Sequence, residues 1–265
     1  MDLGLDRPGA REALHTAVDT IALTDERASE LLAVNVGDIG EPGSAIVRLL
    51  EVLPDPPVDI RITMVTAVST SRACLGQIRA FIVDGIPTTH EVLAILCRTA
   101  LLASSRLLFI VGPEDEETRR INATRILRQE SDSLQRLYKL AEGFKKLIAL
   151  IPPADVIEQQ KRRHDQLLST TKKATESGLL KETAQIVGDL LLASGFDDGS
   201  TQPALSEHLL WIFNNYSGVA HGFGWPRLIS TQPVPGDFIA DLWITAAANQ
   251  LAVDLLQKAH QGPEK

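Results

Sequence analysis

The sequence predicts an all-α protein, a bundle of about eight to ten helices with long antiparallel helices in its core. Three observations predict this fold class. Apolar residues recur at intervals of three and four along most of the chain, as they do on one face of an α-helix. Clusters of proline and glycine separate these stretches. No stretch shows the apolar–polar alternation of a β-strand over a convincing length.

The composition of the 265-residue chain favours helix packing and argues against several classes of function. Hydrophobic residues make up 44 %, mostly Leu, Ala, Ile and Val, and aromatic residues only 5 %. The formal net charge of −8 argues against general nucleic-acid binding. Cys74 and Cys97 lie in apolar stretches, which predicts buried free thiols. We find no uninterrupted apolar run of membrane-spanning length and no signal peptide, so we expect a cytoplasmic protein without a membrane span.

The chain is expected to form an N-terminal helical hairpin over residues 1–53, packed on a main bundle domain over residues 54–265. Residues 6–35 read as two short helices, with Asp6 and Thr24 as their N-caps. A loop over residues 36–44 and a short apolar helix follow, and the PDPP segment at 54–57 ends this part.

The next two helices are predicted to lie at the centre of the bundle. The first covers residues 58–84 and ends before Gly85 and Pro87. The second begins at Thr88, which has capping-box spacing with Glu91, and it is apolar almost all round. Arg98 and Arg106 are its charged exceptions. A charge in such a helix needs a polar partner, and we expect Ser217 or His221 to be the partner of Arg98.

Helices of more polar character are predicted next. The pattern that starts at GPEDEETRR extends to about Leu150, and Gly143 is a candidate for a kink. Residues 154–176 form a polar helix with the basic run KRRH at 161–164, interpreted as a solvated face, with a phosphate or RNA contact as the alternative. Residues 177–196 form a shorter helix. Asp237 to His260 form the last one, with four core candidates: Phe238, Leu242, Val253 and Leu256.

The candidate functional site lies in the segment LSEHLLWIFNNYSGVAHGFGW, residues 205–225, which combines aromatic and polar side chains. Ser217 and His221 share one helix face if the helix continues to His221, and Gly222 then ends it. His221, Ser217 and Arg98 are the candidate catalytic residues. The alternative is a buried structural histidine, satisfied by Ser217 or by a backbone carbonyl. The candidate ligand-binding residues are Tyr216, Asn215, Trp211 and Arg125. The six histidines are scattered without metal-ligand spacing, so we expect neither a metal nor a cofactor.

Two segments carry a resemblance to known proteins. The segment RTALLASSRLLFIVGPEDEETRRINATR and the late FNNYSGVAHG, with its S-x-x-x-H-G pattern, resemble an uncharacterised group of actinobacterial all-helical proteins over about residues 90 to 225. That group carries a glutamate where this sequence has Leu102, so any support from that acid is lost here. A looser likeness is to the HEPN superfamily of helical ribonucleases. Those enzymes place an arginine shortly before the histidine, where this sequence has Asn214, Asn215 and Tyr216.

These observations predict a helical binding or regulatory protein, a homodimer, with a polar pocket lined by Arg98, Ser217 and His221. Its partner would be a small molecule or another protein. One alternative, which the looser likeness implies, is a HEPN-like ribonuclease or defence effector that uses His221 as general acid–base. RNA is therefore a possible but less favoured partner. Another alternative is an enzyme for a small organic substrate, with the aromatic segment as its pocket wall.

Overall fold

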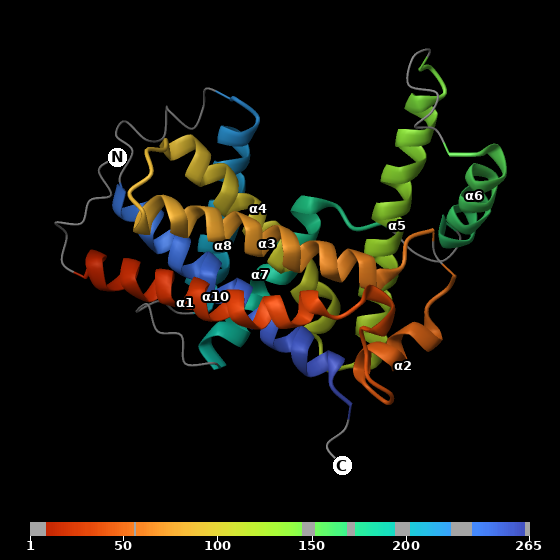
Figure 1. The fold of residues 1–265 in the computed structure, drawn as a ribbon, viewed down its shortest axis with the longest axis horizontal. Coiled ribbons are helices and arrows are strands. Elements are labelled where there is room, and N and C mark those ends of the chain that lie inside the picture. Colours follow the sequence, from red (N-terminus) through yellow and green to blue (C-terminus); the bar gives the residue numbers. More distant parts are fainter. Residues whose placement is uncertain are drawn as a thin grey trace.

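The structure, a computed structural model, describes residues 9–55, 57–144, 152–168, 173–193, 202–223 and 235–262. Over these residues the chain forms nine α-helices and no strand, which confirms the predicted all-α bundle (Figure 1). The helices are α1 (Ala10–Ala33), α2 (Ala45–Val52), α3 (Ile60–Val83), α4 (His90–Val111), α5 (Glu116–Ala141), α6 (Ala154–Leu168), α7 (Glu176–Ala193), α8 (Gln202–Ala220) and α10 (Pro235–His260), and a short 3-10 helix η1 (Val36–Asp38) follows α1.

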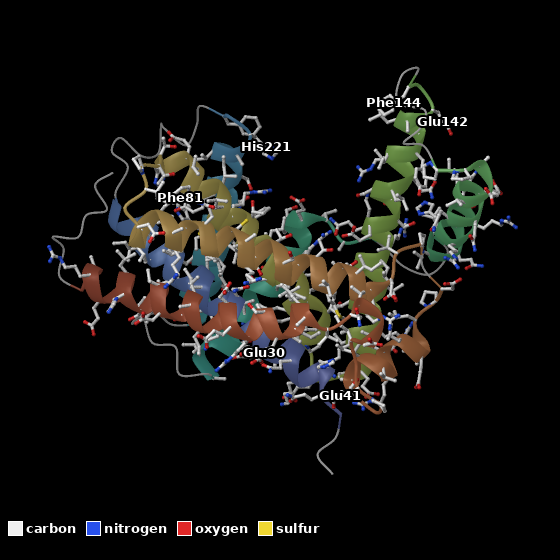
Figure 2. The ribbon with its side chains drawn as sticks, in the orientation of Figure 1. Glu30, Glu41, Phe81, Glu142, Phe144 and His221 are labelled. Atoms are coloured by element: carbon white, nitrogen blue, oxygen red, sulfur yellow. The ribbon has the colours of Figure 1, made fainter. Side chains whose placement is uncertain are left out.

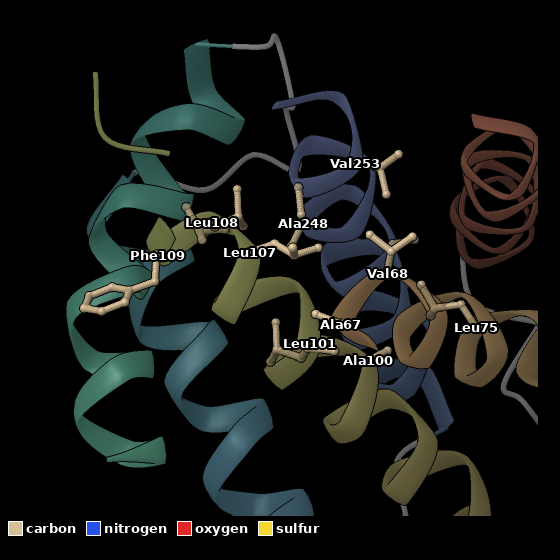
Figure 3. Close-up of a cluster of buried hydrophobic side chains, with 14 of the residues drawn as sticks. Ala67, Val68, Leu75, Ala100, Leu101, Leu107, Leu108, Phe109, Ala248 and Val253 are labelled. Carbon is tan, nitrogen blue, oxygen red and sulfur yellow. The ribbon is translucent and has the colours of Figure 1, made fainter. Parts of the chain in front are cut away.

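Helix α4 is the centre of the molecule, as its apolar sequence predicts. It packs against α3, α10, α8, α7 and α5. Leu101, Leu107 and Leu108 point from α4 into a shared apolar cluster with Val68 of α3 and Val253 of α10 (Figure 3). Burial of each such side chain contributes about 1.5–3 kcal/mol. The four core candidates on α10 (Phe238, Leu242, Val253 and Leu256) are all buried, as predicted.

The N-terminal residues form one long helix, so the prediction of two short helices is wrong. Thr24 does not cap a second helix. It is buried inside α1, and its hydroxyl donates to the Thr20 carbonyl at 2.7 Å. The apolar spacing of Leu14, Ile21 and Leu31 continues past it, and this face packs on α10 and α3. The expected cap of the first helix, Asp6, lies outside the described residues.

Several helix boundaries also differ from the expected ones. Helix α6 ends at Leu168 and does not extend to residue 176, and residues 173–175 are not helical. The N-cap of α4 is Thr89, whose hydroxyl accepts from the Val92 amide at 3.4 Å, and not the adjacent Thr88. Helix α5 ends at Ala141 and does not reach Leu150, because the chain turns at residues 142–143. Gly143 therefore lies in the turn that ends the helix and does not kink it. Residues 145–151 lie outside the described part of the chain.

The second half of α5 and all of α6 form an arm that stands away from the main body, with Glu142 and Phe144 at its tip (Figures 1 and 2). Helix α6 packs against α5, and Leu167 is its buried residue. The basic run of α6 is partly neutralised: Arg163 lies 2.9 Å from Asp55, and Arg162 lies 3.9 Å from Glu158. Arg162 is exposed, in agreement with the predicted solvated face, whereas His164 of the same run is largely buried against α5.

Two helices, α4 and residues Phe238–His260 of α10, are long and apolar enough to cross a membrane by length and composition. This differs from our expectation that no such segment exists. Most of each helix is buried inside the protein. Because the core helices of a bundle have the same length and composition, this property alone does not place either helix in a membrane.

Candidate functional site

Arg98 lies where α4, α7 and α8 meet, and its guanidinium has a partner on each neighbouring helix. Its Nε donates to the Ser217 hydroxyl at 2.7 Å, and one terminal nitrogen donates to Glu176 Oε2 at 3.2 Å. The guanidinium carbon lies 4.8 Å from the centre of the Phe213 ring, a cation–π distance. The expected polar partner of Arg98 is therefore present, and it is Ser217.

Local helix geometry sets these partners in place. Ser217 donates its own hydrogen to the Phe213 carbonyl one turn back, at 2.6 Å, which leaves its oxygen lone pairs free to accept from Arg98. Glu176 is the first residue of α7 and follows Thr175, whose hydroxyl accepts from the Gly178 amide at 3.1 Å. A carboxylate at a helix N-terminus and a cation near the last turn of α8 are both electrostatically favourable.

His221 lies one turn beyond Ser217, at the exposed end of α8 (Figure 2). The helix ends at Ala220, and Gly222 takes a φ of 68°, the left-handed conformation that commonly ends a helix. The His221 backbone amide donates to the Ser217 carbonyl at 3.0 Å, while its ring lies 5.8 Å from the Phe223 ring. The alternative of a buried structural histidine is therefore wrong. Trp225, the last residue of the candidate segment, lies outside the described residues.

The other sequence candidates are spread over different parts of the structure. Trp211 is 49 % exposed, and Asn215 is half-buried. Tyr216 is buried and points to α10. Arg125 of α5 forms a two-bond ion pair with Glu182 of α7, at 2.5 and 2.7 Å, and its guanidinium lies over the Phe109 ring. Arg125 thus belongs to a second contact with α7 and not to the Arg98 cluster.

The Arg125–Glu182 pair shifts the proton affinity of both groups. Hydrogen bonding from Arg125 lowers the pKa of Glu182 below its ordinary value, and burial opposes this to a lesser extent. The same hydrogen bonds raise the pKa of Arg125. Because Arg98 holds Glu176 at the start of α7 and Arg125 holds Glu182 further along, two arginines fasten this helix to α4 and α5.

A buried polar network on α10 was not found by sequence reasoning. Asp241 is 3 % exposed, and its carboxylate accepts from the Tyr216 hydroxyl at 2.5 Å and lies 2.7 Å from His208 Nε2. Further along α10, Thr245 lies 3.2 Å from the Cys97 sulfur, and Asn249 accepts from Ser104 at 3.1 Å. The available signal was the spacing of Asp241, Thr245 and Asn249, which recur every four residues within an apolar helix.

Cys97 is fully buried at this network, and burial raises the pKa of its thiol well above the ordinary value. Cys74 is half-buried, and burial raises the pKa of its thiol as well. Both are free thiols, as predicted. Among the described residues, no three His, Cys, Asp or Glu side chains are grouped as ligands of a metal ion.

Comparison of the chain with protein-family models, with curated proteins and with solved structures gives no significant match.

Proposed function

We propose that this chain is a helical binding protein that binds the carboxylate of an apolar small molecule at Arg98. The observation that carries the proposal is the contact between Arg98 and Glu176. The Arg98 side chain is only 15 % exposed, whereas that of Glu176, at the start of α7, is 52 % exposed. Arg98 therefore binds a carboxylate at this position, and the Glu176 side chain that provides it can move away into solvent.

The comparison with Arg125 supports displacement of Glu176. Glu182 binds Arg125 through two short hydrogen bonds, whereas Glu176 binds Arg98 through a single contact of 3.2 Å. Because the Glu176 carboxylate is half-exposed and is held by this one long hydrogen bond, a ligand carboxylate can compete with it for Arg98. Arg98 itself stays in place, because Ser217 holds its Nε and Phe213 supports its planar group.

The surroundings of Arg98 favour a ligand with an apolar body. Ile95 and Leu102 lie one turn before and after Arg98, on the same side of α4. Ile95 is 39 % exposed and Leu102 is half-buried, so apolar surface is available beside the guanidinium. Ser217 gives its hydrogen to a backbone carbonyl, which favours binding over nucleophilic catalysis at this position.

Isothermal titration calorimetry with octanoate tests the proposal. Arg98→Leu should weaken octanoate binding about tenfold or more, because a hydrogen bond between charged groups contributes about 1.5–3 kcal/mol. Glu176→Gln should strengthen binding, since it removes the competing carboxylate. The matched control is Arg72→Leu, which removes an inter-helix arginine, paired with Asp25 at 2.6 Å, from another face. Equal octanoate affinity in wild type and Arg98→Leu, or no octanoate binding in Glu176→Gln, would overturn the proposal.

A HEPN-like ribonuclease is the second candidate, and one observation favours it. His221 is exposed at the end of α8, where a polymer can reach its ring. HEPN enzymes carry an arginine shortly before the histidine, and Arg98 would have to take that role here. Arg98 is already bound to Glu176 and Ser217, which weighs against an active site that combines it with His221. The homodimeric state and the cytoplasmic location expected from the sequence stay predictions.

A further inference from the structure

Three hydrogen bonds, the α10 latch, join Gly40 and Glu41 of the loop before α2 to His260 and Gly262 at the end of α10. The Gly40 amide donates to Nδ1 of His260 at 2.8 Å, and the Glu41 amide donates to the His260 carbonyl at 2.8 Å. In the opposite direction, the Gly262 amide donates to Glu41 Oε2 at 2.9 Å. Figure 2 shows Glu41 on the opposite side of the molecule from His221. The latch therefore lies apart from the proposed carboxylate site and does not depend on that function.

The bond from Gly40 fixes the protonation state of the His260 ring. A backbone N–H group only donates, so the ring nitrogen that it meets, Nδ1, must accept through a lone pair. Nδ1 therefore carries no hydrogen while this bond exists, and the ring is neutral with its hydrogen on Nε2. A protonated ring carries a hydrogen on both nitrogens and would place Nδ1–H against the Gly40 N–H. The Gly40 bond and a charged His260 ring thus exclude each other.

Two other histidines with side-chain partners differ from His260 in this respect. Nε2 of His208 lies 2.7 Å from a carboxylate oxygen of Asp241. Nε2 of His164 lies 3.7 Å from a carboxylate oxygen of Asp132. A carboxylate accepts from a protonated ring as well as from a neutral one, so uptake of a proton preserves both contacts. At His260, uptake of a proton removes the contact.

The surroundings of His260 allow its ring to take up a proton. The residue is only half-buried, and it is the last residue of α10, where unpaired backbone carbonyls favour a positive charge. Glu41 belongs to the latch, and its negative charge also favours a protonated ring. The nearby cations Arg48 and Arg61 are bound to carboxylates at 2.6 Å. The charged side chains on α10 near the latch and on the neighbouring ends of α1, η1, α2, α3 and α5 are Asp254, Lys258, Arg27, Glu30, Asp38, Arg48, Asp59, Arg61 and Glu116.

We propose that the α10 latch is a pH-sensitive switch, which is closed while the His260 ring is neutral and opens when the ring is protonated. Histidine is the side chain that commonly exchanges its proton between about pH 5 and pH 8, so the switch works in the physiological range. Opening separates the loop from the end of α10. Ile39, which directly precedes Gly40, is 2 % exposed and belongs to the apolar core. Acid therefore exposes an apolar side chain that is buried at neutral pH.

NMR spectra of the ¹⁵N-labelled chain, recorded from pH 8 to pH 5, test this inference. We expect the Gly40 amide signal to move as the His260 ring takes up its proton. Exchange of the Gly40 amide with solvent, relative to the intrinsic rate at each pH, should become roughly threefold to tenfold faster, from the loss of one hydrogen bond. In His260→Gln the side chain takes up no proton over this range, so the Gly40 signal should not follow the pH. The matched control is His15→Gln, an exposed histidine of α1, which should respond as wild type does.

A second variant, Glu41→Gln, separates the two titratable groups of the latch. The response of the Gly40 signal should persist in Glu41→Gln, because His260 is the group that takes up the proton. Three results would contradict the inference: a constant Gly40 signal in wild type while the His260 ring titrates, an equal response in wild type and His260→Gln, or loss of the response in Glu41→Gln. The first of these needs wild type alone, so the inference stays testable even if His260→Gln does not fold.

Discussion

The Tyr216 hydroxyl donates to the Asp241 carboxylate at 2.5 Å, between α8 and α10, and His208 shares the same carboxylate. On the other side of α8, Ser217 accepts from Arg98 of α4. Two adjacent residues of α8 therefore hold it to two different helices. A buried carboxylate is stable in such a position only when donors surround it, so Asp241 fixes how α8 sits against α10.

Asp241→Ala should lower the free energy of unfolding by roughly 3 kcal/mol or more, since each hydrogen bond to a charged group contributes about 1.5–3 kcal/mol. It also leaves the buried Tyr216 hydroxyl without its acceptor. Urea denaturation measures the change. The control is Asp189→Ala, an exposed aspartate on α7, which should stay within about 0.5 kcal/mol of wild type. Equal stability of the two variants would contradict the role of Asp241.

Glu182→Gln should destabilise the protein at neutral pH but not in acid. The pKa of Glu182 is lower in the folded protein than its ordinary value of 4.5. The ionised form therefore favours folding, and its contribution is present above pH 4.5 and is lost as the pH falls below it. The difference in unfolding free energy between wild type and Glu182→Gln should shrink over this acid range. A difference that is constant with pH would show that the carboxylate charge has no effect.

Cys97 should resist alkylation in the native protein. Its thiol is buried and its pKa is raised, so little thiolate is available to react. Mass spectrometry of iodoacetamide-treated protein should show Cys74 modified before Cys97 at pH 8, and both modified in urea. The Cys74→Ser variant isolates the Cys97 rate. Modification of Cys97 as fast in native buffer as in urea would show that the core around Thr245 opens.

His221→Ala should change stability by no more than about 0.5 kcal/mol, because the side chain is exposed at the end of α8. A thermal melt checks this expectation. The same variant separates the two candidate functions. Loss of RNA cleavage at unchanged stability would support the ribonuclease, whereas unchanged octanoate binding is expected from the carboxylate-binding protein.

The sequence predicts the helices well because their signal is local. The apolar composition of residues 90–111 and the spacing of Phe238, Leu242 and Val253 are sufficient to identify two core helices. The exact residues at which the helices begin and end are harder to predict. Thr88 and Thr89 offer the same hydroxyl, and only the backbone conformation decides that Thr89 caps α4. Thr24 looks like a cap, but it is accommodated inside α1 by bonding to the Thr20 carbonyl.

The candidate site was only partly predictable, because its contacts join residues that are far apart in the chain. The pairing of Arg98 with Ser217 could be inferred, since a charge in an apolar helix needs a polar neighbour. Glu176 was missed because an exposed acid at a helix start is ordinary in sequence. Asp241 was missed because its partners are recognisable only after α8 and α10 pack together.

The packing of α1 on α10 has a consequence for synthesis in the cell. Arg27 and Asp254, which bond across these two helices, are 227 residues apart in sequence. During synthesis, α1, α3 and α4 leave the ribosome before α10 has been made. The apolar face of α4 that packs on α10 therefore stays exposed to solvent until the remaining helices are made. Folding of this core is therefore complete only after its last helix is made, and until then the chain exposes apolar surface that the finished protein buries.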